Sequence, residues 1–197
     1  MQYFPVIKIT VFLVCLIPLG RLIWLGLFNQ LSTNPIEFIT HSTGSWTLNF
    51  LLITLSITPL RQLSGWSWLI KLRRMVGLYA FFYACVHFMT YIWLDQFFSL
   101  SDILRDVLKR PFITVGFTAF ILLIPLAITS TNAMLKTLGG KRWQKLHRLI
   151  YLIAIFGVLH FWWLVKKDIT EPLIYAVILA SLLGYRVWMW QRKMGLK

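Results

Sequence analysis

Six long apolar runs, separated by short charged segments, constrain the fold of this chain more than any other feature of its sequence. A helix needs roughly 20 residues to cross a hydrocarbon core of about 30 Å. Runs of about that length lie at residues 9–28, 44–60, 75–94, 111–131, 146–165 and 172–191. Membrane β-strands alternate apolar with polar positions, and these runs do not. The sequence therefore predicts an all-α, polytopic membrane bundle of six transmembrane helices.

The composition also indicates an integral membrane protein. Of the 197 residues, 58% are hydrophobic and 13% are charged, which is far more apolar than a soluble domain of this length. The first run lacks the small-residue cleavage pattern of a secretory signal, so we interpret it as a span. No long soluble segment interrupts the runs, and residues 1–197 are predicted to form a single transmembrane domain. Cys15 and Cys85 both lie within runs, so we expect them to be small core residues that form no disulfide.

The distribution of charge predicts the orientation, because short loops rich in Lys and Arg stay on the cytoplasmic side. One set of helix ends holds fourteen basic residues and no acid: Lys8, Arg61, Lys71, Arg73, Arg74, Lys136, Lys141, Arg142, Lys145, Arg148, Arg186, Arg192, Lys193 and Lys197. The other set holds six basic residues and all six acids. Both termini are therefore predicted to be cytoplasmic. The net charge of +14 then faces anionic membrane lipid, which leaves little reason to expect a nucleic-acid partner.

Two histidines are predicted to lie at the same depth in the membrane. His87 lies thirteen residues beyond Arg74 on the third run, about 20 Å along a helix. His160 lies fifteen residues beyond Lys145 on the fifth run, about 22 Å along. Both helices start on the cytoplasmic side in this topology, so each presents one imidazole in the outer half of the bilayer.

This histidine pair predicts a haem held between the third and fifth helices. Imidazole binds iron, copper or zinc, but a zinc or copper site needs three or four protein ligands, and no Cys, Asp or Glu lies at that depth. A haem needs only two, because the porphyrin supplies the rest. Two other interpretations of His87 and His160 stay open: hydrogen bonds between helices, and a proton relay in a transporter.

A third histidine, His147, lies beside Lys145 and Arg148 and about 20 Å below His160 along the same helix. A second bis-histidine haem there would need a partner at the inner level, where the third run carries Arg73 and Arg74 instead. One haem is therefore predicted, and a second remains open only if its other ligand is not histidine. With its basic neighbours, His147 also suits a quinone oxygen or a flavin phosphate.

One further candidate, Arg21, lies near the outer end of the first run. It is either a counter-charge for the haem propionates or an arginine that snorkels to the interface.

Three sequence blocks carry a resemblance to a known family. They are TPLRQL, then LRRMVGLYAFFYACVHFMTYIW, then ITSTNAMLKTLGGKRWQKLHRLIYLIAIFGVLHFWWLVKKD. Together they resemble the MsrQ family, also called YedZ, within the ferric-reductase-like transmembrane group, and the similarity extends over essentially the whole chain. In that group the haem ligands lie on two helices that correspond to the runs bearing His87 and His160, and His147 matches an inner position. Arg73 or Arg74 stands where the oxidases of the group have an inner histidine.

The resemblance implies a function. MsrQ proteins lie in the bacterial inner membrane and pass electrons from the quinone pool, or from a cytosolic flavin reductase, through haem b to MsrP. MsrP is a periplasmic molybdopterin enzyme that repairs methionine sulfoxide in oxidised proteins, and FMN binding is also associated with the family. The chain is thus expected to be an electron-transfer subunit of an oxidoreductase complex rather than its catalytic subunit. The alternative is a self-contained transmembrane metalloreductase or oxidase, which would need no partner.

Overall fold

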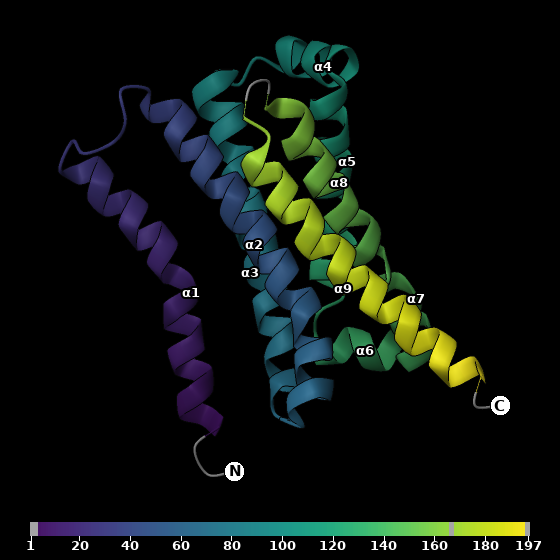
Figure 1. Ribbon diagram of the computed structural model, residues 1–197. Coiled ribbons are helices and arrows are strands. Elements are labelled where there is room, and N and C mark those ends of the chain that lie inside the picture. The colour runs from purple at the N-terminus through teal and green to yellow at the C-terminus, as the bar shows by residue number, and fades with distance from the viewer. Residues whose placement is uncertain (1–3, 166–167, 196–197) are drawn as a thin grey trace.

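The computed structural model describes residues 4–165 and 168–195, and within these ranges every regular element is a helix (Figure 1). In chain order they are α1 (Phe4–Leu27), α2 (Pro35–Ser64), α3 (Leu69–Thr90), the π-helical η1 (Tyr91–Asp95), α4 (Leu100–Lys109), α5 (Pro111–Ile128), α6 (Asn132–Leu138), α7 (Gly140–His147), α8 (Leu149–Leu164) and α9 (Thr170–Gly195).

Five helical segments of the described chain are long and apolar enough to cross a membrane. They are Phe4–Leu27, Leu69–Asp95, Pro111–Ile128, Gly140–Leu164 and Thr170–Arg192. The prediction of an all-helical, multi-pass membrane protein is therefore confirmed. The remaining predicted run, 44–60, corresponds to α2, which is a helix of 30 residues but is too polar to count among these five.

The polarity of α2 follows from its central position. It packs against α3, α8 and α9 as well as α1, and it contributes more fully buried side chains than any other helix of the described residues, among them Thr43, Leu51 and Leu55. A helix surrounded by protein does not need the continuous apolar surface that lipid demands. Several of its Thr and Ser hydroxyls bond backbone carbonyls one turn earlier, as Thr54 does to Phe50.

The bounds of α2 differ from the predicted run, 44–60. The helix begins at Pro35 because the Asn34 side chain accepts a hydrogen bond from the Glu37 N–H at 3.3 Å and so caps the first turn. It ends at Ser64 because Gly65 adopts a left-handed φ of 74°. A search for apolar residues finds only the apolar part of a helix, whereas capping residues decide where the helix begins and ends.

The helices form two main pairs, with α3 packed along α2 and α8 packed along α5. The helix α1 stands at the side of the bundle (Figure 1) and contacts α3 and α2. It contains Pro18, which removes one backbone hydrogen bond from the helix. The fully buried Tyr83 hydroxyl of α3 inserts there, donating to the Cys15 carbonyl at 2.9 Å and accepting from the Leu19 N–H at 3.1 Å. This contact attaches α1 to the bundle.

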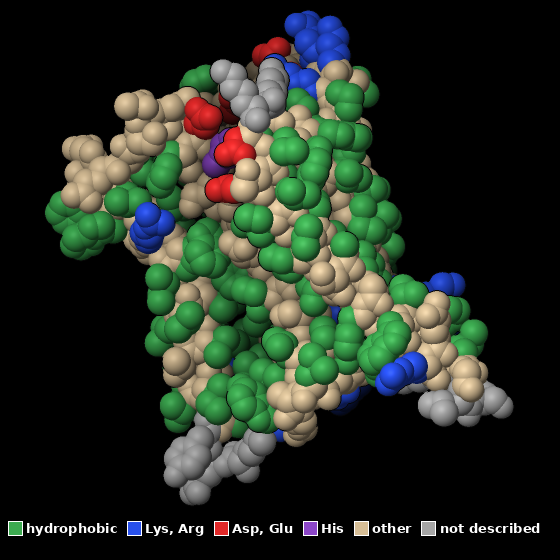
Figure 2. Space-filling view, in the orientation of Figure 1, with side chains coloured by type: hydrophobic (Ala, Val, Ile, Leu, Met, Phe, Trp, Pro, Cys, Tyr) green, Lys and Arg blue, Asp and Glu red, His purple; other side chains and the backbone are tan. Residues whose placement is uncertain are grey.

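The two ends of the bundle differ in charge. The described chain begins and ends at the same end of the bundle, which also carries α6 and α7, while α4 caps the opposite end (Figure 1). Apolar side chains cover the flank and acidic side chains gather near the α4 end (Figure 2). The described residues therefore show the separation of charge that the sequence predicted. Lys166, Lys167 and Lys197 lie outside the described residues, and the side chain of Lys193 is not described.

Candidate functional site

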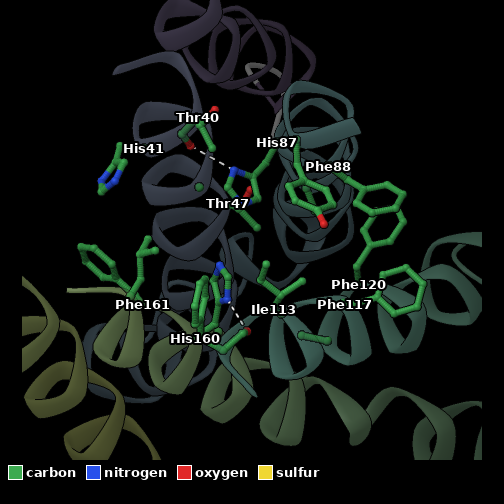
Figure 3. Close-up of a pocket in the computed structure, with 18 of the residues that line it drawn as sticks. Thr40, His41, Thr47, His87, Phe88, Ile113, Phe117, Phe120, His160 and Phe161 are labelled. Atoms are coloured by element: carbon green, nitrogen blue, oxygen red, sulfur yellow. Dashed lines mark hydrogen bonds between the residues drawn. The ribbon is translucent and has the colours of Figure 1, made fainter. Parts of the chain in front are cut away.

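A cavity of about 730 Å³ lies between α2, α3, α5 and α8, within the roughly 300–1,000 Å³ range of ligand pockets. We call it the histidine cavity, because His87 of α3 and His160 of α8 both line it. Figure 3 shows the two imidazoles facing each other across it. Most of the remaining wall is apolar or aromatic and includes Leu48, Leu51, Phe88, Phe112, Phe117 and Phe120.

The ring of His87 is fixed by the backbone of α2. Its Nδ1 lies 3.0 Å from the carbonyl oxygen of Thr40, and the Thr43 hydroxyl lies 3.4 Å away. A carbonyl oxygen can only accept a hydrogen bond, so Nδ1 carries the hydrogen and donates it. In the neutral imidazole this leaves the lone pair of Nε2 for a metal ion, the arrangement that orients histidine ligands in metalloproteins.

The ring of His160 is fixed in the same way by α5. Its Nδ1 donates to the carbonyl oxygen of Phe112 at 2.7 Å. The two histidines therefore come from different helix pairs, yet each is held through Nδ1 by a backbone carbonyl of the helix packed beside it. Backbone carbonyls keep their positions as long as the helix persists, so both rings are preorganised.

A glycine stands four residues after each of these carbonyls and lets the ring approach. A Cβ at Gly44 would lie 3.0 Å from His87 Cε1, and a Cβ at Gly116 would lie 2.6 Å from His160 Nδ1. In an α-helix the residue four positions on stands directly over a given carbonyl. Any side chain at Gly116 would therefore occupy the space through which His160 reaches Phe112.

The spacing of the rings fits a shared metal ion. The ring centroids of His87 and His160 are 6.2 Å apart, with an interplanar angle of 74°. Imidazole nitrogen binds a metal ion at about 2 Å and the ring centre lies about 1 Å farther, so two rings on opposite sides of one ion have centres about 6 Å apart. Within the described residues no three His, Cys, Asp or Glu side chains form a metal site. Two imidazoles in an aromatic cavity thus fit a haem, which supplies its other four ligands.

Arg21, the further candidate from the sequence, lies away from this cavity. Arg21 is exposed on α1 and is not among the residues that line the histidine cavity. Gly157 lines the cavity, where a Cβ would lie 3.3 Å from Leu48. The cation of the described residues that does line this cavity is Arg110, which forms an ion pair of 3.3 Å with Asp106.

A second cavity, of about 400 Å³, lies nearer the end of the bundle that carries α6 and α7. We call it the arginine cavity, because Arg73, Arg74, Arg148 and Arg186 line it. His147 lines it too and has no second histidine beside it, since the chain has four histidines and the other three line the histidine cavity. His147 and His160 therefore line different cavities, and no second imidazole is available for another bis-histidine site.

His147 is held firmly in the wall of the arginine cavity. Its Nε2 lies 3.0 Å from the Thr129 hydroxyl, which itself donates to the Pro125 carbonyl at 2.6 Å. Because that hydroxyl has one hydrogen, His147 is the donor in the bond between them. The Trp143 ring stacks on the imidazole with centroids 3.8 Å apart and donates from Nε1 to the Thr129 carbonyl at 2.8 Å.

Comparison with known proteins agrees with this architecture. The family model of the ferric-reductase-like transmembrane component matches residues 40–158, which begins at Thr40 and includes His87 and His147. A protein from Herminiimonas arsenicoxydans called "Protein-methionine-sulfoxide reductase heme-binding subunit MsrQ" is 61% identical over 95% of this chain and 87% of its own length. The chain belongs to the MsrQ family. The resemblance predicted from three sequence blocks is thereby confirmed.

Two further MsrQ proteins give the same result at lower identity. The one from Azospira oryzae is 56% identical over 92% of this chain and 78% of its own length. The one from Bordetella pertussis is 51% identical over 96% of this chain and 92% of its own length. No solved structure matches the chain.

Sequence reasoning missed the residues that hold the imidazoles and one that joins the arginines. Thr40 and Phe112 act through backbone carbonyls, which any residue would provide, so their identity carries no signal. Gly44 and Gly116 can be read in the sequence. Their role in admitting an imidazole, however, depends on which helix packs beside each histidine. Arg186 was assigned to the end of a span, and only the packing of α9 against α2 and α8 brings it to Arg73 and Arg74.

Proposed function

We propose that this protein is the haem-binding membrane subunit of a methionine sulfoxide reductase system and transfers electrons across the bacterial inner membrane. The observation that carries the proposal is the pair of facing imidazoles, each tied through Nδ1 to a backbone carbonyl. The MsrQ relatives are named heme-binding subunits, which supports the proposal.

In this proposal His87 and His160 would hold one haem b between α3 and α8. A haem held by two imidazoles supplies a one-electron carrier. The carbonyls of Thr40 and Phe112 fix the orientation of each ring and keep the hydrogen on Nδ1. Such a hydrogen bond also raises the basicity of the nitrogen that binds the metal. The apolar and aromatic part of the wall would pack against the macrocycle. Arg110 is a candidate counter-charge for the haem propionates beside the earlier candidate, Arg21.

The proposed topology has six membrane spans, namely α2 and the five apolar helical segments named above, with both termini in the cytoplasm. The basic residues gathered at the end with α6 and α7 support this orientation. The α4 end, with its acidic residues, would then face the periplasm. The histidine cavity would lie in the outer half of the membrane and the arginine cavity in the inner half.

Electrons would enter at the arginine cavity and leave at the α4 end. The donor is a quinone or a cytosolic flavin reductase, and FMN is a candidate cofactor on the donor side. His147 and the stacked Trp143 line the entry. The acceptor is MsrP, which would approach the loops of residues 95–110 and 166–171, where Lys166 and Lys167 lie outside the described residues.

The decisive experiment measures haem in the purified protein and in His87→Ala, His160→Ala and His147→Ala. Reduced-minus-oxidised spectra with pyridine haemochrome quantification should give about one low-spin haem b per wild-type chain. His87→Ala and His160→Ala should each abolish the low-spin spectrum, because one axial ligand is lost. His147→Ala should keep it. A colourless wild type would refute the proposal and favour the transporter interpretation.

The same preparations distinguish the electron-transfer subunit from the alternative function. A self-contained metalloreductase or oxidase would reduce oxygen or a ferric chelate at a steady rate once its haem is reduced, without a partner. The electron-transfer subunit should reoxidise rapidly only when purified MsrP and methionine sulfoxide are added together. Fast turnover on oxygen alone would favour the oxidase.

A further inference from the structure

The short helix α4 is held against the bundle along one side. The Thr114 hydroxyl of α5 donates to the Val107 carbonyl in the last turn of α4. The Asp106 carboxylate of α4 accepts from the Gln96 side chain at 3.1 Å and pairs with Arg110 at 3.3 Å. These contacts fix which side of α4 turns towards the bundle, so the opposite side is a defined surface.

The outer side of α4 is divided lengthwise into an apolar row and a polar row, because residues four apart are neighbours on a helix. The first row, which we call the leucine stripe, consists of large apolar side chains: Leu100, Leu104 and Leu108. These leucines are 68%, 55% and 84% exposed, in that order. The second row, which we call the polar stripe, consists of exposed polar side chains: Ser101, Arg105 and Lys109.

Three exposed leucines in one row are unfavourable in water, and a contiguous apolar patch marks a surface that something covers. The position of α4 indicates what covers it. The helix lies at the end of the bundle, where basic side chains project from the tip and apolar side chains cover the flank below (Figures 1 and 2). That flank includes Ile121 and Ile128 of α5, the helix that follows α4 directly. Lipid is therefore already the neighbour of this part of the molecule.

A boundary between lipid and water accounts for the division into two stripes. A helix that lies in the membrane interface places apolar side chains on the lipid side and Lys or Arg on the water side, where they meet headgroup phosphates. The cations Arg105 and Lys109 stand directly beside the leucines on the helix surface. We propose that α4 lies in the membrane interface, with the leucine stripe in the outermost acyl region and the polar stripe among the headgroups and water.

This placement limits how a protein partner can approach α4. The leucine stripe is closed to it by lipid, whereas the polar stripe stays accessible from water. The proposal rests on the membrane class of the protein and on α4 alone, and it depends neither on a haem in the histidine cavity nor on the identity of the acceptor.

The first test measures the depth of each stripe with a nitroxide label. The labelled cysteines are introduced one at a time, after Cys15→Ala and Cys85→Ala, as Ser101→Cys, Leu104→Cys, Arg105→Cys and Leu108→Cys. The full-length protein is placed in nanodiscs of phosphatidylcholine and phosphatidylglycerol. Collisions of the label with oxygen, which concentrates in lipid, are compared with collisions with a water-soluble nickel chelate.

The two stripes should give opposite results. Labels on the leucine stripe should favour oxygen and lie roughly 5–10 Å inside the headgroup boundary, whereas labels on the polar stripe should favour nickel. Nickel-accessible labels on the leucine stripe would overturn the proposal, because that stripe then faces water. Labels shielded from both reagents would overturn it too, because a second copy of the protein then covers the helix.

A second test keeps the native cysteines and measures thermal unfolding in the same nanodiscs. Leu108 is 84% exposed, so it has little packing against protein to lose, and Gln has nearly the same helix propensity as Leu. Leu108→Gln should lower the unfolding temperature if lipid covers this side chain. Lys109→Gln, the matched control on the polar stripe, should unfold close to the wild-type temperature. Unfolding of Leu108→Gln at or above the wild-type temperature contradicts the proposal. Haem content should be unchanged in both variants, so this result is separate from the test of the proposed function.

Discussion

The histidine cavity and the arginine cavity are lined by many of the same helices, yet they are built for opposite kinds of ligand. The histidine cavity satisfies Nδ1 of both imidazoles within the protein and presents an apolar wall. The arginine cavity gathers four guanidinium groups, and the buried Nε of Arg186 has no hydrogen-bond partner there. The first therefore offers two imidazole nitrogens within a largely apolar wall, and the second offers four guanidinium groups. The difference shows that the same helices can present opposite chemistry at the two ends of one bundle.

The largest effect should come from Gly116→Ala, which closes the approach of His160 to α5. The added Cβ would lie 2.6 Å from Nδ1, so the ring must leave the Phe112 carbonyl. Loss of such a supporting contact typically weakens metal binding about ten- to hundred-fold. Haem per chain and the haemin affinity of the haem-depleted protein measure it.

The matched control for that variant is Gly184→Ala, where a Cβ meets nothing within 4 Å. It should retain the wild-type haem content. If Gly116→Ala also binds haem normally with an unchanged spectrum, the Phe112 contact does not position His160.

Gly44→Ala should have a similar but smaller effect on the other ligand. Its Cβ would meet His87 Cε1 at 3.0 Å, and the nitrogen lies farther away at 3.2 Å, so a small rotation of the ring relieves the contact. We expect haem affinity to fall by up to about ten-fold and the reduction potential and low-spin band to shift. A loss as severe as that of Gly116→Ala would show that the α2 contact is the less tolerant of the two.

Tyr83→Phe should lower stability while sparing the chemistry of both cavities. Tyr83 lies on α3 between Arg73 and His87 and lines neither cavity. Its hydroxyl bonds the Cys15 carbonyl and the Leu19 N–H of α1. Removing it leaves buried backbone groups unpaired, at a cost of about 1–3 kcal/mol.

Reversible unfolding in mixed micelles measures that change, with Tyr185→Phe as the comparison. Haem content should remain at the wild-type value in Tyr83→Phe. A parallel loss of haem would mean that α1 contributes to the histidine cavity.

The smallest effect should come from Asp106→Asn, which breaks the ion pair with Arg110 at the edge of the histidine cavity. The Arg110 side chain is 54% exposed, so water screens the pair and its loss should cost less than about 1 kcal/mol. The same unfolding measurement checks this. A shift in the reduction potential of the haem without a change in stability would identify Arg110 as its counter-charge.

The sequence by itself determined the helical membrane class and the pairing of two histidines. Apolar runs of membrane-spanning length admit little besides helices. The rise per residue is fixed, so two helices that start at the same side must bring His87 and His160 to one level. The rings are indeed neighbours. The family was also readable, because its blocks are ordered along nearly the whole chain.

Only the tertiary structure decided which groups surround those side chains. In a membrane, the lipid-facing and protein-facing sides of a helix are both apolar, so periodicity does not reveal which helices pack together. That choice places Thr40 and Gly44 at His87, and Phe112 and Gly116 at His160. It also brings Arg186, more than a hundred residues along the chain, to Arg73. Hydrogen bonds to backbone carbonyls and shared charge depend on positions in space, which the order of residues alone does not give.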